Sequence, residues 1–468
     1  MVLEDFKIPA NLTQLISSEQ AYQYMVVPIA LENETVIFKS NDTSNALKIE
    51  LKIILGRSIE LVHESEDNIK KYLTTNFRTG RQTQSKEFSY SSDFLEQILI
   101  TAKDIGSSDI HFEAYENRCR VRFRLDGKLK EYFIISNEDY PIIINKLKIR
   151  AGLDISEKRL PQDGRITIVT ASDEFDIRVS SLPILHGEKI VLRILSKDAD
   201  HIQLHDLGFS KREILLYKEA VKRPNGIILI SGPTGSGKTT TLYATLKLLN
   251  NEDRNILTIE DPIEYTLEGI NQVQLKENIG LDFSSTLRTF LRQDPDVIMV
   301  GEIRDANTAN MGIRAALTGH LVLSTIHTNS AWATITRLID MGIPPFLIAS
   351  TLNVSVAQRL VRKLCTYCKQ KTSISSEDFP SSFSINKQLV DQCIPVGCDH
   401  CYHTGYYGRK AIYEIIPITK ELVFYIKENR LEIDQYIEEN SIPTLRDNAI
   451  KLIKEGITSI EEVYSLLI

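Results

Sequence analysis

The sequence predicts an α/β protein built around a largely parallel sheet with covering helices. Four short apolar runs recur between residues 226 and 327: IILIS, NILTIED, DVIMVGEI and HLVLSTIH. Each run is followed by polar or glycine-rich residues and then by a helical pattern, which is typical of strands alternating with crossover helices. The first run leads directly into a glycine-rich loop and a helical segment, TTTLYATLKLL.

A different pattern precedes this sheet and indicates an α+β domain. FLEQILITAKDIG and IIINKLKIRAGLDI have helical periodicity, whereas DIHFEAYENRCRVRFRLDGKLKEY and RITIVTASDEFDIRVSSLP alternate like strands joined by turns. Near the N-terminus, VVPIAL and VIFKS read as strands and SNALKIELKIIL as a helix. The predicted segments are an α/β domain at 1–75, a linker at 76–88, the α+β domain at 89–200, the parallel-sheet domain at 201–364, a cysteine-rich element at 365–410 and a mostly helical segment at 411–468.

The composition is that of an ordinary globular protein. The 468 residues are 42% hydrophobic and 25% charged, with a formal net charge of -7. This acidic balance argues against a protein whose main task is to neutralise nucleic-acid phosphates. No run of about 18 apolar residues indicates a membrane-spanning helix, and MVLEDFKIPANL lacks the pattern of a signal peptide. We expect a cytoplasmic protein that meets a membrane only through partners.

The glycine-rich loop matches the phosphate-binding pattern G-x-x-x-x-G-K-[ST] in full. Glycines let backbone N–H groups turn toward phosphate oxygens, and the following helix directs its positive end at the same anion. We expect Lys238 to reach the β- and γ-phosphates of ATP and Thr239 to place its hydroxyl on Mg²⁺. The predicted nucleotide-binding residues are Gly232, Pro233, Thr234, Gly235, Ser236, Gly237, Lys238, Thr239 and Thr240.

Carboxylates follow two of the predicted strands, at the edge where parallel sheets bind their ligands. Glu260 and Glu264 lie in ILTIEDPIEY, and Glu302 ends DVIMVGE. Hydrolysis needs an acidic group near Mg²⁺ and another group that orients the attacking water. We assign Glu302 to the metal and Glu264 to the water, with Glu260 as the alternative to Glu264. His327, at the end of HLVLSTIH, either contacts the γ-phosphate or is structural.

Arginines of the α+β domain are candidates for a cation that acts across a subunit boundary. Phosphoryl transfer gains from a cation placed on the developing charge, and this cation is often an arginine supplied in trans. The candidates are Arg124, Arg165, Arg178 and Arg193. Position alone does not separate this role from that of an ordinary surface ion pair.

Five of the six cysteines lie between residues 365 and 401, which in a reducing compartment indicates a metal site rather than disulfides. Two CxxC pairs are the ligand set of a closed, structural Zn²⁺ site. The predicted zinc ligands are Cys365, Cys368, Cys398 and Cys401. His400 and His403 are alternative ligands, whereas Cys119 and Cys393 are interpreted as packing thiols.

With these motifs in this order, the chain resembles the secretion ATPases of type II secretion and type IV pilus assembly. The phosphate loop is followed by ILTIEDPIEY, LRQDPDVIMVGEIRD, GHLVLSTIHTNSA, RLVRKLC and the double CxxC. The similarity covers about residues 90–468 and includes SSDIHFE, VRFRLDG and TGYYGRKAIYEI. Residues 1–75 resemble the family's variable N-terminal domain more loosely. They lack the repeated Leu/Gly pattern associated with cyclic-di-GMP binding, so this ligand is not predicted.

The resemblance implies a RecA-like P-loop ATPase domain preceded by an α+β, PAS-like domain, with a four-cysteine zinc insertion and a helical C-terminal segment. It implies that Lys238 and Thr239 are the phosphate and Mg²⁺ groups. It makes Glu264 the catalytic carboxylate of the family's Asp box and Glu302 the Walker B acid.

Further residues take their expected roles from the same resemblance. His327 is the His-box residue, and Arg165 and Arg178 match arginines that approach the nucleotide from the side. Trp332 departs from the family, in which small residues or proline usually follow the His box. This departure leaves open where the next helix begins.

Members of this family are hexameric ATPases on the cytoplasmic face of the inner membrane, where they drive assembly of a pilus or pseudopilus. The resemblance therefore implies a homohexamer that works with an inner-membrane platform protein and an adaptor, without direct contact to nucleic acid. The double CxxC favours an assembly motor over a retraction or DNA-uptake motor. A nucleic-acid translocase with a zinc ribbon is the more distant alternative, disfavoured by the pI of about 5.8 and by the Asp and His boxes.

Overall fold

The computed structural model describes residues 8–13, 15–32, 35–77, 86–87, 94–169, 174–195, 202–381, 383 and 391–468. The chain forms two compact units. The first unit comprises Met1–Lys86, Arg362–Gly408 and Ala449–Ile468, and the second comprises Glu87–Val361 and Arg409–Asn448. The domain boundaries drawn from the sequence stay predictions, and most of the predicted linker lies outside the described residues. None of the described helices is long and apolar enough to cross a membrane.

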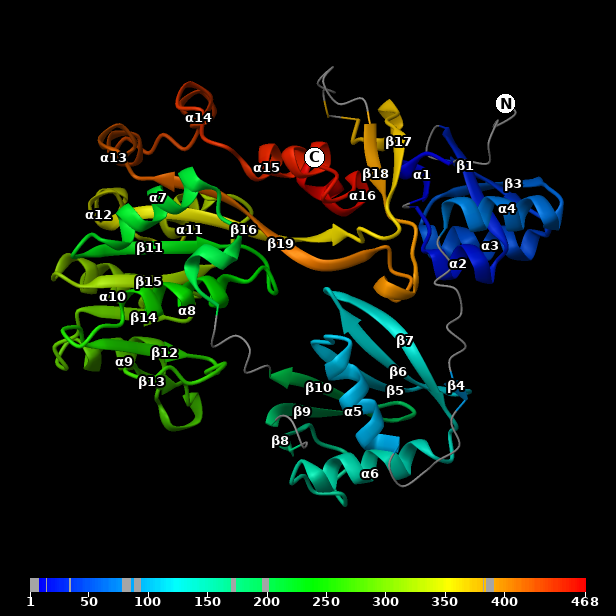
Figure 1. Ribbon diagram of the computed structural model, residues 1–468, viewed down its shortest axis with the longest axis horizontal. Helices are drawn as coiled ribbons and strands as arrows, with labels where there is room; N and C mark the ends of the chain where they lie inside the picture. Colours follow the sequence, from blue (N-terminus) through cyan, green and yellow to red (C-terminus); the bar gives the residue numbers. More distant parts are fainter. Residues whose placement is uncertain are drawn as a thin grey trace. The chain divides into compact units, whose positions relative to one another are not determined.

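A seven-stranded sheet contains all four strands that the sequence predicts to be parallel (Figure 1). In spatial order its strands are β13 (Asn271–Gln274), β12 (Ile256–Glu260), β14 (Val297–Val300), β15 (Leu321–Ile326), β11 (Gly226–Ser231), β16 (Leu352–Leu364) and β19 (Tyr406–Pro417). β12 pairs in parallel with β14, β14 with β15, and β15 with β11. Because both faces of the sheet are covered, β11 and β15 are buried along their whole length and read as near-continuous apolar runs.

Three further strands of this sheet were not predicted. β13 pairs in parallel with β12 at one edge, β16 pairs in parallel with β11, and β19 forms the other edge beyond β16. Residues 411–468, predicted to be mostly helical, therefore begin as a strand. The segment AIYEII is rich in β-branched and aromatic residues and is buried throughout, because it covers the edge of the sheet. The helices α13 (Lys420–Lys427), α14 (Asp434–Glu439), α15 (Leu445–Lys454) and α16 (Ile460–Val463) then follow.

Helices alternate with the parallel strands, as the pattern predicts. They are α7 (Lys211–Val221), α8 (Lys238–Leu249), α9 (Phe283–Phe290), α10 (Ala306–Leu317), α11 (Ala333–Asp340) and α12 (Pro345–Thr351). In the core, Leu242 and Leu246 of α8 belong to one buried cluster with Ile228 of β11 and Leu323 of β15. This packing fixes α8, and with it the phosphate loop at its start, on the sheet.

Trp332 occupies the N-cap position of α11, so the helix begins directly after it. Its side chain is only 7% exposed, and the indole Nε1–H donates a hydrogen bond to the carbonyl oxygen of Leu431 at 2.7 Å. The bulky residue after the His box is thus accommodated by burial against the C-terminal part of the second unit. As the only tryptophan of the chain, it is also a fluorescent probe of this region.

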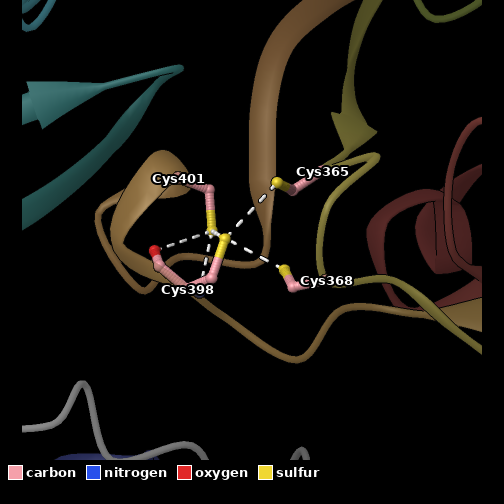
Figure 2. A group of neighbouring side chains, drawn as sticks. All are labelled: Cys365, Cys368, Cys398 and Cys401. Carbon is pink, nitrogen blue, oxygen red and sulfur yellow. Dashed lines mark hydrogen bonds between the residues drawn. The ribbon is translucent and has the colours of Figure 1, made fainter.

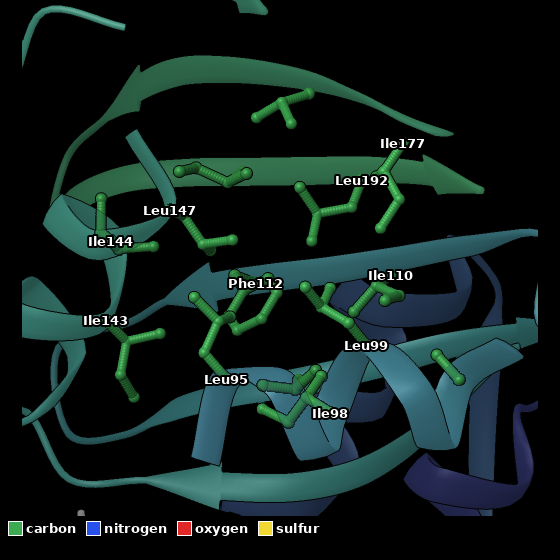
Figure 3. Close-up of a cluster of buried hydrophobic side chains, with 14 of the residues drawn as sticks. Leu95, Ile98, Leu99, Ile110, Phe112, Ile143, Ile144, Leu147, Ile177 and Leu192 are labelled. Atoms are coloured by element: carbon green, nitrogen blue, oxygen red, sulfur yellow. The ribbon is translucent and has the colours of Figure 1, made fainter. Parts of the chain in front are cut away.

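The α+β domain is a second seven-stranded sheet with two helices packed on it. Its strands, in spatial order, are β4 (Lys86–Glu87), β7 (Lys128–Ile135), β6 (Cys119–Leu125), β5 (Asp109–Ala114), β10 (Gly187–Leu195), β9 (Glu174–Ile184) and β8 (Gln162–Val169). The predicted helices are present as α5 (Phe94–Asp104) and α6 (Tyr140–Arg150), and the predicted hairpin is β8–β9. Figure 3 shows Leu95 and Leu99 of α5 and Leu147 of α6 meeting Phe112 of β5 in the core of this domain.

The first unit contains a three-stranded sheet and the cysteine-rich element. Its sheet consists of β1 (Val26–Glu32), β2 (Thr35–Ser40) and β3 (Ser58–His63), with helices α1 (Ala10–Thr13), α2 (Ser18–Gln23), α3 (Asn45–Leu55) and α4 (Glu66–Asn76). The two strands and the helix predicted here are β1, β2 and α3. The cysteine-rich element contributes a short antiparallel pair, β17 (Gln370–Ser373) with β18 (Asp391–Ile394).

Replacing Leu323 with alanine should destabilise the second unit. Leu323 is completely buried in β15, and the cavity left behind should lower the free energy of unfolding by about 2–5 kcal/mol. Urea denaturation followed by Trp332 fluorescence measures this loss. Leu215→Ala is the matched control, because Leu215 is 64% exposed on α7 and its truncation should change stability by less than about 0.5 kcal/mol. Equal losses in both variants would contradict the burial of Leu323.

Candidate active site and metal centre

The phosphate loop joins the end of β11 to the start of α8 and depends on glycines with positive φ. Gly232, Gly235 and Gly237 have φ angles of 150°, 80° and 85°. A Cβ at Gly232 would lie 2.5 Å from the carbonyl oxygen of Gln358 and 2.7 Å from Ser236 Oγ. The backbone at Gly232 is therefore packed too closely for any side chain, which keeps the loop in its turn around an anion-sized space.

Polar groups of the loop are arranged as a phosphate-binding site requires. Lys238 is 9% exposed, and its Nζ donates to the carbonyl oxygens of Gly232 at 2.9 Å and Pro233 at 3.0 Å. Burial lowers the pKa of Lys238, and the charge of Glu302 opposes this shift. Among the described residues, no hydrogen-bond partner is present for the buried Ser236 Oγ. A buried hydroxyl without a partner is costly, and a bound phosphate oxygen would satisfy it.

The predicted Mg²⁺ ligand lies at the open side of the same loop. Thr239 is exposed and Thr240 half-buried in the first turn of α8, whereas Lys238 faces inward. The side chain of Thr239 is therefore at the surface, where its hydroxyl could hold a bound ion. Hydroxyl and carboxylate oxygens are donors that a hard cation such as Mg²⁺ takes, so Thr239 and Glu302 fit this ion by their chemistry.

Glu302, His327 and Arg304 meet where β14 and β15 end. His327 Nε2 lies 3.2 Å from one carboxylate oxygen of Glu302, and the guanidinium of Arg304 pairs with the other. Arg304 also lies 3.6 Å from Asp261, which follows β12. The pairing with Glu302 raises the pKa of Arg304. Arg304 was not among the predicted site residues, although it stands two positions after Glu302 in GEIRD.

Glu260 and Glu264, which the sequence could not separate, lie in different environments. Glu260 is 3% exposed. Its carboxylate accepts hydrogen bonds from the Tyr243 hydroxyl, from Thr258 Oγ1 at 2.6 Å and from Gln272 Nε2 at 3.1 Å. The side chain of Glu264 is 38% exposed. The carboxylate of Glu264 is therefore accessible to water, whereas that of Glu260 is buried and accepts hydrogen bonds from interior side chains.

The four candidate arginines divide into three groups. Arg178 Nη1 lies 3.4 Å from a carboxylate oxygen of Glu264, and its Nη2 donates to the carbonyl oxygen of Ile263. Arg165 pairs at 2.5 Å with Asp176 of its own sheet. Arg124 and Arg193 both pair with Asp109, at 3.2 Å and 3.0 Å. Among the ion pairs that the structure describes, Arg178 is the one of these four that pairs with a carboxylate predicted for the site.

Two residues of β16, Gln358 and Arg359, lie beside the phosphate loop, and neither is among the predicted site residues. Gln358 Oε1 accepts a hydrogen bond from Thr241 of α8 at 2.9 Å. Arg359 donates to the carbonyl oxygens of Gln358 at 3.0 Å and of Asn329 at 2.8 Å, so it connects the loop region with the segment after His327. The sequence predicts no strand over RLVRKLC, and this segment enters the prediction only through the family resemblance.

The four cysteines of the double CxxC converge (Figure 2). Their sulfur atoms all lie within 4.8 Å of one another. The Cys365–Cys398, Cys368–Cys401 and Cys398–Cys401 sulfur distances are each 3.8 Å. Four thiolates at about 2.3 Å from a tetrahedral Zn²⁺ ion are about 3.8 Å apart. All six cysteines of the chain are free, so the cluster fits a zinc ion and not a pair of disulfides.

Backbone N–H groups favour the thiolate form of one cysteine in this cluster. Burial alone would raise the pKa of Cys401, but N–H groups of Cys398 and Gly405 donate to its sulfur and lower its pKa to about 7. Burial raises the pKa of the Cys365 thiol, and it raises that of Cys368 to about 12. The alternative ligands point elsewhere: His403 pairs with Asp399 at 2.9 Å, and the ring of His400 lies 4.2 Å from that of Tyr367.

The other two cysteines are accounted for without a metal. Cys393 lies in β18, beside Gly456, and is outside the group of four. Cys119 is buried in β6, where its thiol donates to Asn137 Oδ1 at 3.3 Å.

Comparison with known proteins agrees with the motifs. Residues 84–465 match the family described as Type II/IV secretion system protein, and residues 1–83 match the MshEN domain. The chain is 40% identical to the type IV pilus assembly ATPase PilB of Myxococcus xanthus over 98% of its own length and 87% of that protein. It is 44% identical to the type II secretion system protein E of Aeromonas hydrophila, over 98% of both chains.

Solved structures with a similar fold include an ATPase and a retraction motor. The ATPase DotB of Legionella pneumophila aligns with a TM-score of 0.60 at 22% identity, covering 82% of this chain and 97% of DotB. The pilus retraction motor PilT, solved with bound ADP, aligns with a TM-score of 0.54 at 27% identity, covering 79% of this chain and 96% of PilT.

Replacing Gly232 with alanine should weaken nucleotide binding by at least tenfold, about 1.4 kcal/mol. The added methyl group would meet the carbonyl oxygen of Gln358 and push the loop out of its turn. Titration with a fluorescent ATP analogue measures the affinity. Gly235→Ala is the control, because Gly235 also has a positive φ but a Cβ there meets nothing within 4 Å. An equal effect of both substitutions would mean that φ strain, and not close packing, limits the loop.

Proposed function

The chain belongs to the type II/IV secretion system protein family and is an ATPase, and we propose that it is a hexameric motor that powers assembly of a type IV pilus or a pseudopilus. One observation carries the enzymatic part of this proposal. The phosphate loop, Glu302 and His327 come together at the carboxyl edge of one parallel sheet, where this architecture binds nucleotides. Relatives named for both machines match the chain at similar identity, so the proposal covers both.

In the proposed reaction, Lys238 and the loop N–H groups bind the β- and γ-phosphates of ATP. Glu264 orients the attacking water and takes its proton, which its partial exposure supports. His327 contacts the γ-phosphate while it is paired with Glu302. Charge that develops on the transferred phosphoryl group is stabilised by the lysine and by arginines of the α+β domain.

Thr239 and Glu302 are the proposed residues that hold Mg²⁺, which when bound neutralises phosphate charge. The pairing of Glu302 with His327 and Arg304 fixes the orientation of its carboxylate. Arg165 and Arg178 are proposed to act on the nucleotide of a neighbouring subunit. The exposure of Arg165, 64% for its side chain, leaves it accessible for this role.

The proposed place of action is the cytoplasmic face of the inner membrane, with a platform protein and an adaptor of the machine as partners. A retraction or DNA-uptake motor is the second candidate, supported by the structural similarity to PilT. The four-cysteine cluster favours an assembly motor, because the resemblance associates this element with assembly motors. Stimulation of hydrolysis by DNA or RNA would instead support a nucleic-acid translocase.

ATPase activity per subunit should rise with protein concentration as a six-subunit species forms, because Arg165 and Arg178 complete the site across a boundary. Steady-state hydrolysis and size-exclusion chromatography on the same samples measure both quantities. Lys238→Ala and Glu302→Ala should lower kcat by about 100-fold or more at every concentration. Concentration-independent activity from a monomer would contradict the shared site and remove the in-trans roles of both arginines.

The protein purified under reducing conditions should contain one zinc ion per chain, measured by atomic emission. Cys365→Ser should lose this zinc and lower the thermal unfolding temperature, because a closed site of four cysteines stabilises the element around it. Cys393→Ser is the matched control, since Cys393 lies in the same element but outside the cluster. Equal zinc content in the two variants would contradict the proposed ligand set.

A further inference from the structure

A buried network connects the phosphate-loop helix with the segment that carries Glu264. Tyr243 lies on α8, five positions after Lys238, and is completely buried. Its hydroxyl donates to a carboxylate oxygen of Glu260 at the end of β12. The same hydroxyl accepts a hydrogen bond from the backbone N–H of Glu264 at 3.3 Å. One side chain thus bonds to both Glu260 and Glu264.

A second side chain fixes the same segment further along. Gln272, on the neighbouring strand β13, donates to the Glu260 carboxylate at 3.1 Å and to the carbonyl oxygen of Tyr265 at 3.2 Å. Its own amide oxygen accepts from the N–H of Leu267 at 2.6 Å. The ring of Tyr265 also packs edge-on against that of Tyr243, with centroids 4.6 Å apart. The backbone around Glu264 is therefore fixed at three successive points.

Satisfying the buried carboxylate of Glu260 does not by itself require the bond between Tyr243 and Glu264. A carboxylate buried at the end of β12 is costly and must be satisfied, and Thr258 and Gln272 already serve one oxygen of Glu260. The Tyr243 hydroxyl serves the other oxygen and still accepts from Glu264. Burial and the nearby Glu260 raise the pKa of Tyr243, so its hydroxyl keeps the proton that it donates.

We propose that Tyr243 is a positioning residue for hydrolysis: it ties the backbone of Glu264 to the helix that begins at the phosphate loop. Glu260 is its anchor, which gives this buried acid a role other than that of a base. A movement of α8 that follows a change in the phosphate loop therefore reaches the backbone of Glu264 through the hydroxyl of Tyr243. The inference rests on the proposed function, because it assigns Glu264 to the attacking water.

Tyr243→Phe tests this role, because it removes the hydroxyl and keeps the ring. A misplaced catalytic group typically costs up to about 100-fold, so we expect kcat to fall by about 10-fold to 100-fold. The KM for ATP and the affinity for ADP should change by less than about twofold, since Lys238 and the loop keep their contacts. The measurement is steady-state hydrolysis by the full chain in its oligomeric form, with ADP binding on the same samples.

Tyr217→Phe is the matched control. Tyr217, on α7, is as completely buried as Tyr243. Its hydroxyl bonds at 2.8 Å to Thr245 on α8, the helix that carries Tyr243. Loss of this hydroxyl should leave kcat unchanged. If Tyr243→Phe fails to fold, Gln272→Met provides a second variant, because it releases Tyr265 and Leu267 from the other side and should lower kcat in the same way.

A double variant separates positioning from a general loss of structure. Glu264→Ala should by itself reduce kcat about 100-fold, and adding Tyr243→Phe to it should reduce the rate no further. A merely structural effect would lower the residual rate of Glu264→Ala as well, and this result would overturn the proposal. Wild-type kcat in Tyr243→Phe would overturn it too. Wild-type kcat in Glu264→Ala would instead overturn the role assigned to Glu264 under the proposed function, which keeps the two failures apart.

Discussion

The candidate site depends on one constraint: parallel strands that are buried on both faces must place their polar residues where the strands end. β11, β12, β14 and β15 are apolar and buried along their length, so the phosphate loop, Glu264, Glu302 and His327 all follow strand ends. Because the strands run in the same direction, these ends lie on a single edge. Residues far apart in the sequence are thereby brought to the same edge of the sheet.

Burial then divides the acidic residues of this edge by environment. Glu260 still belongs to β12 and is enclosed by Tyr243, Thr258 and Gln272, whereas Glu264 follows the strand and is accessible. The two side chains have the same chemistry, and only their surroundings differ. A buried carboxylate whose oxygens accept hydrogen bonds can fix the position of the neighbouring backbone, whereas an accessible carboxylate can bind water.

The cysteine cluster does not depend on this sheet edge, since it lies in the first unit. Two short knuckles bring four sulfur atoms to the spacing that a tetrahedral ion requires, while N–H groups of the surrounding backbone point at them. Such a centre stabilises an element that has little apolar core of its own. Its two-stranded sheet, β17 with β18, is too small to be stable alone.

The sequence by itself determined the α/β class, the four parallel strands, the phosphate loop and the two CxxC pairs, because periodicity and fixed spacing are local properties. It did not reveal β13, β16 or β19, since the conformation of these strands depends on the sheet that they join. Nor could it separate Glu260 from Glu264 or find Arg304 and Tyr243 as their partners. Those distinctions depend on burial and on hydrogen bonds between distant segments, which exist only once the strands are packed side by side.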